Sequence, residues 1–317
     1  MFVQTAHFIQ DHMPNKSVNE AITVYGTELK NNNTKLAKMN LAVHGIEGSI
    51  IESNSFYTNP HNLTGKCDFV MANPPFNVSG IDGKNKFLTE DARLPFGAPL
   101  TKGGTIGNGN YLWIQYFHSY LNETGRAGFV MASSATDAGH AEKLIRQKLI
   151  ETGDIECIVS IANNFFYTRS LPCHVWFFNK DKKAENKDKI LMIDARNTYR
   201  KVSSTIQDFS EDQLEGLTAL INVFRGDELG VSKDNEWFTE HFPDGTYADV
   251  EGLCKVVDLD DLKEQDYSLT PGRYVGVNID IDMDFDYKGR MTEIRSELVT
   301  LNQEAVALMK KIQGVEL

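Results

Sequence analysis

The sequence contains no long hydrophobic run, and its few cysteines are scattered. No apolar stretch approaches the roughly 18 residues that a membrane-spanning helix needs, and the start Met1–Gln4 is not a positively charged leader. The cysteines at positions 67, 157, 173 and 254 are too far apart for metal-ligand spacing. We therefore expect reduced thiols in a cytoplasmic protein that binds no metal and no membrane.

Positive charge is also in deficit, with 32 Lys and Arg residues against 44 Asp and Glu, a formal net charge of −12. Affinity for DNA comes largely from neutralising phosphates, so this balance is the wrong sign for a stand-alone DNA-binding protein. If the substrate is DNA, other chains must supply most of the binding. A length of 317 residues with 41% hydrophobic content is enough for one large or two modest domains.

The motif that organises the chain lies at residues 67–76. The apolar run Phe69–Ala72 predicts a buried strand. The strand must end at Asn73, because the two prolines that follow have no N–H for a ladder. A chance turn is the alternative, but a strand followed by Asn-Pro-Pro-aromatic should arise by accident in only about one chain of this length in a hundred.

This turn suits the methylation of an exocyclic amine. The NH2 of adenine is a poor nucleophile, because its lone pair is delocalised into the ring. The side-chain oxygen of Asn73 and the carbonyl of Pro74 can both accept its hydrogens and favour a more nucleophilic nitrogen. Phe76 offers a face on which a base can stack, worth roughly 1–3 kcal/mol. A base in a duplex must be flipped out to reach such a pocket.

The motif Asn73–Phe76 resembles the Asn-Pro-Pro-Phe/Tyr motif of amino-methyltransferases. More narrowly, the chain resembles the modification (M) subunit of type I restriction-modification systems, which are adenine-N6 DNA methyltransferases; Gly125–Met131 and Thr270–Gly276 carry further likeness. The resemblance implies an α/β fold of the class I S-adenosylmethionine-dependent methyltransferases and S-adenosylmethionine as the cofactor. It also implies a catalytic role for Asn73, Pro74, Pro75 and Phe76, with Asn73 contacting the cofactor as well.

The segment before this motif alternates helices and strands, which is typical of a parallel, doubly wound sheet. We expect a helix over residues 1–13, a strand over 22–26, a helix capped at Asn33-Thr34 and a strand over 49–51. Glu28 follows the first strand, where nucleotide-binding folds keep an acid for ribose hydroxyls, although a solvated loop residue is the alternative. Asn54 follows the second strand. The resemblance implies that Glu28 and Asn54 both bind the cofactor, although the family usually has Asp where Asn54 stands.

Two parts of the family pattern are absent. The first motif, a strand followed by Asp-Pro-Ala-Cys-Gly and further glycines, does not occur, nor does the helical amino-terminal domain. We therefore expect the carboxyl-terminal part of a longer protein, with a sheet that lacks its first strand. The strands at 22–26 and 69–72 then either close up or leave unpaired backbone groups between them.

The segment from residue 77 to residue 108 has no clear periodicity, and we expect a mobile substrate-facing segment, with functionless disorder as the alternative. A helix then begins near Asn110, which either caps it or, as the resemblance implies, binds the cofactor near its methionine end. Farther on, the resemblance implies that Phe165, Phe166 and Tyr167 wall the flipped base opposite Phe76; a core cluster is the alternative.

The carboxyl-terminal third divides into two further parts. We expect a catalytic core over 1–230, a connecting region over 231–290 with a structural turn at Tyr267–Gly276, and a heptad helix over 291–317. Asp280–Asp286 predicts an acidic solvated edge rather than a calcium loop, because Tyr287 replaces the required glycine. Met291, Ile294, Leu298, Leu301, Ala305, Leu308 and Ile312 form a narrow apolar seam. The seam either folds back on its own core or, as the resemblance implies, packs on the helices of a specificity subunit.

Three hypotheses follow. The first is an adenine-N6 DNA methyltransferase subunit that works on double-stranded DNA with a specificity subunit and a restriction subunit. The second is a methyltransferase for protein glutamine or RNA, because such enzymes share Asn-Pro-Pro-aromatic motifs. The third is a catalytically inactive, truncated scaffold.

Overall fold

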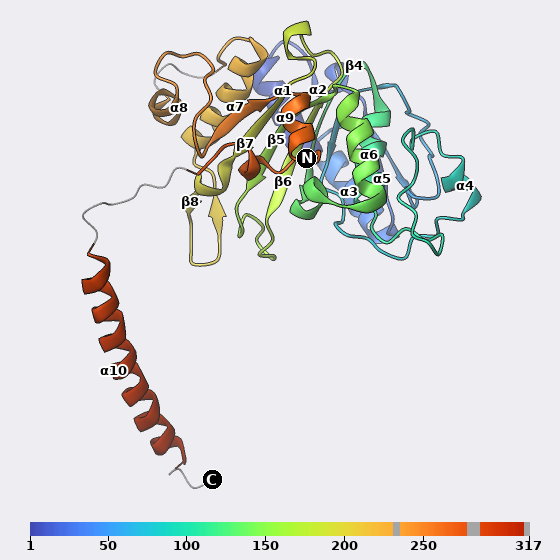
Figure 1. Ribbon diagram of the computed structural model, residues 1–317. Coiled ribbons are helices and arrows are strands. Elements are labelled where there is room, and N and C mark those ends of the chain that lie inside the picture. Colours follow the sequence, from blue (N-terminus) through green and yellow to red (C-terminus); the bar gives the residue numbers. More distant parts are fainter. Residues whose placement is uncertain (231–234, 278–285, 314–317) are drawn as a thin grey trace. The chain divides into compact units, whose positions relative to one another are not determined.

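The computed structural model describes residues 1–230, 235–277 and 286–313, which fall into two compact units, Met1–Val277 and Asn278–Leu317 (Figure 1). The helices of the first unit are α1 (Phe2–His12), α2 (Val18–Ala21), α3 (Asn31–Val43), α4 (Lys86–Thr89), α5 (Asn110–Tyr120), α6 (His140–Glu151), α7 (Glu211–Arg225), α8 (Glu236–His241) and α9 (Leu259–Glu264). The strands are β1 (Val24–Glu28), β2 (Gly48–Glu52), β3 (Cys67–Ala72), β4 (Leu121–Ala132), β5 (Ile155–Ile161), β6 (Cys173–Asn179), β7 (Ile190–Asp194), β8 (Arg200–Lys201), β9 (Gln207–Asp208) and β10 (Cys254–Val257).

The main sheet has six strands in the order β10-β7-β5-β6-β4-β3. Strands β3, β4, β5 and β7 run in one direction, while β6 and β10 run against their neighbours. The parallel pairing expected of the segment before the motif is confirmed for β1 and β2, whereas the main sheet is mixed. The reason is that β6 returns directly from β5 without a crossover helix and inserts between β5 and β4, which fixes its reversed direction.

Alternate residues of the central strands fill two cores. Ile158, Trp176 and Met192 face the layer of α5, α6 and α9, whereas Val159, Leu191 and Ile193 face α7 and α8. All residues of β5 and β7 are buried, including Glu156, Ser160 and Asp194 among their mostly apolar neighbours, as expected for strands covered on both faces. Ser210 caps α7 and forms a capping box with Gln213.

The compact unit extends beyond the boundary expected at residue 230. Strand β10 pairs with β7, and Leu262, Leu269 and Val275 are buried in the core beside α5 and α6. The segment 267–276 forms a structural turn, as expected, with Leu269 N donating to Thr136 O at 2.8 Å and Arg273 donating to Asp137 at 2.5 Å. Most of the expected acidic edge Asp280–Asp286 lies outside the described residues.

Strand β3 is less buried than its apolar sequence predicts. Phe69 is 73% exposed and Met71 is 53% exposed, because β3 is the edge strand and pairs with β4 alone among the described strands. Strands β1 and β2 form a separate parallel pair that packs on α1 and α3. The strands at 24–28 and 67–72 therefore do not close up into one ladder; α1 reaches β3 through the Thr5 hydroxyl, 3.8 Å from the sulfur of Met71.

The second unit contains α10 (Tyr287–Gln313), so the expected heptad helix is confirmed as a helix. Its seam residues Leu298, Leu301 and Leu308 are 58–60% exposed. An exposed seam at heptad spacing is the pattern of a helix that packs on another helix.

We expect the open edge of β3 to promote self-association of this chain. Replacing Phe69 with Lys should lower the association measured by analytical ultracentrifugation over a range of concentrations, because a charge on an edge strand blocks edge-to-edge pairing. The melting temperature should not fall, since the Phe69 side chain is largely in solvent.

Leu144→Lys is the matched control, because it removes a 60% exposed apolar side chain from α6 and leaves the sheet edge intact. Equal loss of association in both variants would show that general surface hydrophobicity, and not the edge of β3, is responsible.

Candidate active site

The Asn-Pro-Pro-Phe turn leaves the sheet at the carboxyl end of β3, as predicted. The side chain of Asn73 is exposed, Pro74 is half-buried, and Phe76 packs against both cores. Because the ladder between β3 and β4 ends at Ala72, the carbonyl of Pro74 is free of sheet pairing. Two hydrogen-bond acceptors and an aromatic ring are thus presented together at one edge of the sheet.

One of the three aromatic residues expected opposite Phe76 lies there. The rings of Phe76 and Phe166 meet edge to face, with centroids 6.4 Å apart and an interplanar angle of 75°. Phe165 instead packs against Phe209 at 4.8 Å, and Tyr167 is 87% exposed. The alternative of a core cluster therefore suits Phe165, while Tyr167 remains accessible to a ligand.

Glu28 and Asn54 lie at the carboxyl ends of the paired strands β1 and β2. Ser53 N donates to Glu28 O at 2.9 Å, which holds the two ends together. The Glu28 carboxylate accepts from Lys30 N at 3.2 Å and from the Asn33 amide at 3.3 Å. Asn33 is thus inside α3 and bound to Glu28, and the expected cap at Asn33-Thr34 is wrong: the helix begins after Lys30.

The side-chain oxygen of Asn54 accepts from Phe56 N at 3.0 Å. This bond shapes the turn after β2 and uses one lone pair of the oxygen, while the amide NH2 is not needed for the turn.

Asn110 does not cap α5, because Gly109 holds that position. It is 1% exposed, and both ends of its amide bind the residue after Phe76: its oxygen accepts from Asn77 N at 2.9 Å and its NH2 donates to the Asn77 oxygen at 3.0 Å. Asn108 donates to the same Asn77 oxygen at 2.9 Å. These bonds fasten the start of α5 to the Asn-Pro-Pro-Phe turn.

Residues 77–108 fold around a small core of their own. Ile81, Leu88, Leu94 and Ile106 pack with Phe56 and with Leu112 and Tyr116 of α5. The segment is therefore a packed cap with one short helix, which contradicts the alternative of functionless disorder, while a mobile substrate-facing role stays a prediction. Sequence periodicity could not reveal this core, because its members come from turns with irregular spacing.

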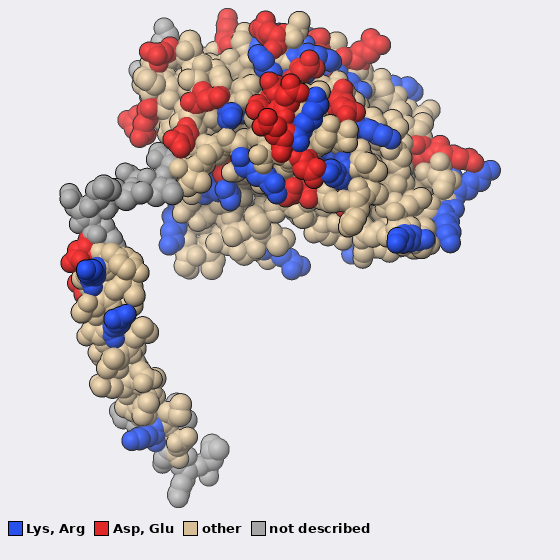
Figure 2. Space-filling model, in the orientation of Figure 1, with Lys and Arg blue, Asp and Glu red and all other residues tan. Residues whose placement is uncertain are grey.

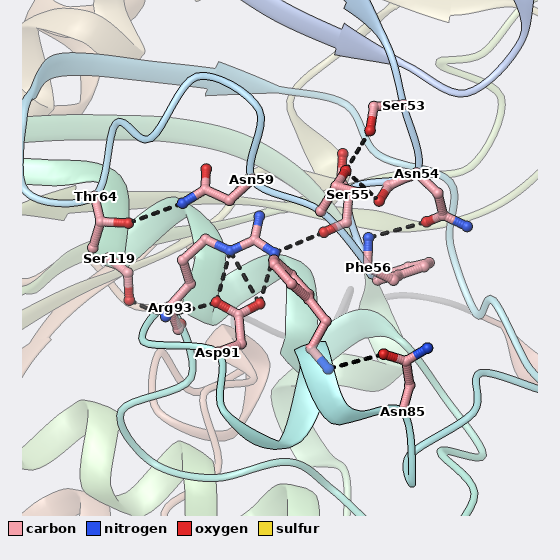
Figure 3. A network of polar contacts seen from close by, with 12 residues as sticks. Ser53, Asn54, Ser55, Phe56, Asn59, Thr64, Asn85, Asp91, Arg93 and Ser119 are labelled. Atoms are coloured by element: carbon pink, nitrogen blue, oxygen red, sulfur yellow. Dashed lines mark hydrogen bonds and ion pairs between the residues drawn. The ribbon is translucent and has the colours of Figure 1, made fainter.

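A buried arginine holds this cap to the turn that carries Asn54 (Figure 3). Arg93 is 1% exposed; it pairs with Asp91 at 2.6 Å and donates to the carbonyl of Ser55 at 2.8 Å. Its guanidinium lies 4.0 Å from the ring centroid of Tyr116. No sequence pattern marks Arg93 or Asn77, because the role of each depends on contacts with residues far away in the chain.

His174, in β6, is buried. Burial lowers the pKa of His174 to about 4, so the ring is neutral at neutral pH. Its Nδ1 atom nevertheless finds no hydrogen-bond partner within the part of the chain that the structure describes, so it is not fully satisfied.

The described residues contain neither a candidate metal-binding cluster nor a candidate membrane-spanning helix. Within residues 1–230, 235–277 and 286–313, no group of three His, Cys, Asp or Glu residues could hold a metal ion. Over the same ranges, no helix has both the length and the apolar character needed to cross a bilayer.

An open α/β sheet with Asn-Pro-Pro-Phe at its carboxyl edge defines a class of amino-methyltransferases, and comparisons with known proteins specify the family. Residues 1–282 match the family described as N-6 DNA Methylase. The chain is 34% identical to the type I restriction enzyme MjaIX methylase subunit of Methanocaldococcus jannaschii, over 94% of this chain and 50% of the relative. It is 31% identical to the type I restriction enzyme HindI methylase subunit of Haemophilus influenzae, over 99% of this chain and 65% of the relative.

Solved structures agree on the fold. The type I restriction-modification methyltransferase subunit of Streptococcus thermophilus superposes with a TM-score of 0.66 at 18% identity, covering 86% of this chain and 57% of that one. The EcoKI M protein superposes with a TM-score of 0.60 at 20% identity, covering 99% and 66%. The chain belongs to the N-6 DNA methylase family and has the class I methyltransferase fold, and it spans about half to two thirds of the length of the curated relatives named above.

We expect Arg93 to contribute more to the free energy of unfolding than an exposed ion pair does. Replacing it with Met should lower the free energy of unfolding by about 3–5 kcal/mol in urea titrations, because Asp91 would remain as a buried charge without its partner.

Arg200→Met provides the control, because it breaks a pair of similar length, 2.7 Å, with Asp208 on an exposed hairpin. That change should cost no more than about 1 kcal/mol. Similar costs for both variants would contradict the assigned role of the Arg93 network.

Proposed function

We propose that this chain is the catalytic part of an adenine-N6 DNA methyltransferase subunit of a type I restriction-modification system. The observation that carries the proposal is the turn after β3, which presents the exposed amide of Asn73 and the carbonyl of Pro74 beside Phe76 and Phe166. Membership of the N-6 DNA methylase family and likeness to type I methylase subunits over nearly the whole chain support it.

The geometry suits an amine substrate that enters as a single flipped base. The two oxygens of Asn73 and Pro74 would accept the hydrogens of the adenine amine, while the base stacks on Phe76 with Phe166 and Tyr167 at its sides. Stacking of this kind is worth roughly 1–3 kcal/mol. The chemistry requires no general base, because the methylated amine can lose its proton to water.

S-adenosylmethionine would be the second substrate, and the residues at the ends of β1 and β2 fit it. Glu28 offers a half-buried carboxylate that already accepts two hydrogen bonds, the chemistry that ribose hydroxyls need. Asn54 offers its NH2 group and the second lone pair of its oxygen to the adenine ring. When bound, the cofactor supplies an electrophilic methyl group; this chain would position it between Glu28, Asn54 and Asn73.

Other chains would supply much of the binding affinity for double-stranded DNA. The net charge of −12 opposes binding to phosphates, and Figure 2 shows acidic side chains gathered around α9, which carries Asp260, Asp261 and Glu264. We propose a specificity subunit as the partner that packs on the exposed seam of α10, and a restriction subunit as a further member of the complex. A cytoplasmic location remains a prediction.

Asn73→Ala tests the chemistry in the protein that contains this chain, assembled with its partners. Methyl transfer to duplex DNA should fall at least about a hundredfold, equivalent to about 2.7 kcal/mol, because one acceptor for the amine is lost. Phe76→Ala should weaken binding of the flipped base by roughly 1–3 kcal/mol. Both variants should still bind the cofactor in isothermal titration. Unchanged turnover in Asn73→Ala would contradict the proposal.

The seam of α10 is tested by replacing Leu298 and Leu308 together with Glu. The double variant should lose co-purification with the specificity subunit, because two charges would be buried in a helical interface without partners. The thermal transition should stay within a few degrees, since both side chains are exposed in this chain.

Thr300→Glu with Gln303→Glu adds the same charge on the opposite face of α10 and should leave assembly intact. Unfolding of the leucine variant, with no partner captured by the unmodified protein, would assign the seam to the protein's own core.

A further inference from the structure

Three asparagines link the catalytic turn to the start of α5. Asn77 follows Phe76 directly, and its oxygen accepts from both Asn108 and Asn110, at 2.9 and 3.0 Å. The side-chain oxygen of Asn110 accepts in turn from Asn77 N at 2.9 Å. Asn108 closes the ring by accepting from Asn110 N at 2.9 Å.

The conformation of Asn77 depends on this ring. Its φ is +54°, in the left-handed region that residues other than glycine occupy at a cost, although Asn tolerates it better than most. Two hydrogen bonds to the side chain and one to the backbone N–H offset that cost. Asn110 is buried and directs both ends of its amide at Asn77, so neither end is turned toward solvent or a ligand.

Close approach of the backbone supports the same contact. Gly109 N donates to Val78 O at 2.8 Å, and a Cβ atom on Gly109 would lie 2.9 Å from the side chain of Ile81. A side chain at position 109 would therefore have to displace the end of the Ile81 side chain and would crowd Val78 O, at 3.4 Å. The glycine and the asparagines act on the same junction.

The side chain of Asn73, in contrast to that of Asn77, is not held by hydrogen bonds to other described residues. Its side chain is exposed, and no hydrogen bond fixes it within the described ranges, so its position depends on the backbone on either side. On one side is β3, which is paired to β4 as far as Ala72. On the other side are two prolines with fixed φ and then Asn77, so the asparagine ring is the second anchor of a short, stiff turn.

We propose that Asn77 and Asn110 are positioning residues for methyl transfer, which set the placement of Asn73 and Phe76 by fixing the far end of the turn. This inference rests on the proposed function. It replaces the expectation that Asn110 contacts the cofactor near its methionine end. A misplacement of about 1 Å can cost around a hundredfold in rate, so an anchor of this kind acts on turnover and not on cofactor affinity.

The test is steady-state kinetics of Asn77→Gly and Asn110→Ala in the assembled protein, with duplex DNA as substrate. Glycine keeps the left-handed backbone at position 77 and removes only the side chain. We expect kcat to fall about tenfold for Asn77→Gly and further for Asn110→Ala, with the KM for S-adenosylmethionine within about twofold. The double variant should cost less than the product of the two single effects, because both act through one contact.

Asn62→Gly is the matched control, since Asn62 is another left-handed asparagine, with a φ of +48°, in an exposed turn away from these contacts. It should leave kcat and KM unchanged. Hydrogen–deuterium exchange of residues 73–79 gives a readout without activity: Asn110→Ala should speed exchange there, because Asn77 N loses its acceptor, while exchange over β4 stays constant.

The possible failures differ. A raised KM for S-adenosylmethionine with unchanged kcat in Asn110→Ala would restore Asn110 as a cofactor residue and overturn the inference. Unchanged kinetics in Asn77→Gly and Asn110→Ala, with Asn73→Ala inactive, would overturn the inference and leave the proposed function standing. Full activity in Asn73→Ala would overturn the proposed function itself. Should Asn110→Ala fail to fold, Asn77→Gly alone decides.

Discussion

Pro74 and Pro75 impose the constraint on which the site depends, because neither can donate a hydrogen bond to a neighbouring strand. The ladder between β3 and β4 therefore ends at Ala72, and the chain turns away from the sheet with almost no rotational freedom. A turn of this kind holds its shape only if both of its ends are fixed. Pairing with β4 fixes one end, and the contact of Asn77 with α5 fixes the other.

Much of the fold could be predicted from the sequence, because it depends on local patterns. The apolar runs of β5 and β7, the capping box at Ser210 and the strand before Asn73 each follow from residues within a few positions of one another. The exposure of Phe69 could not be predicted in this way, since burial of a strand depends on which strands lie beside it. The reversed direction of β6 is likewise a property of sheet order.

Some residues of the candidate site could likewise be predicted from local sequence, and others could not. The sequence predicted Asn73, Phe76 and the placement of Glu28 and Asn54 at strand ends, because a motif or a strand boundary marks each of them. The roles of Asn77, Asn110 and Arg93 depend on partners that lie between 2 and 38 positions away in loops without periodicity. Local reasoning assigned Asn110 to a cap or a ligand, since the start of a helix offers no hint of a partner in another turn.

Two of the three described sheets of the first unit contribute residues to the candidate site. Glu28 and Asn54 belong to the β1–β2 pair, whereas Asn73 and Phe76 belong to the six-stranded sheet, and no described backbone ladder joins the two. Side chains therefore control the spacing between the methyl donor's expected position and the base, notably the guanidinium of Arg93, which joins Ser55 to the cap and α5. Backbone ladders fix distances to a strand spacing that no substitution can alter. A distance set by side chains can instead be increased or decreased by single substitutions. The distance between the methyl donor and the base is therefore a property that evolution can adjust in this protein without rebuilding its sheet.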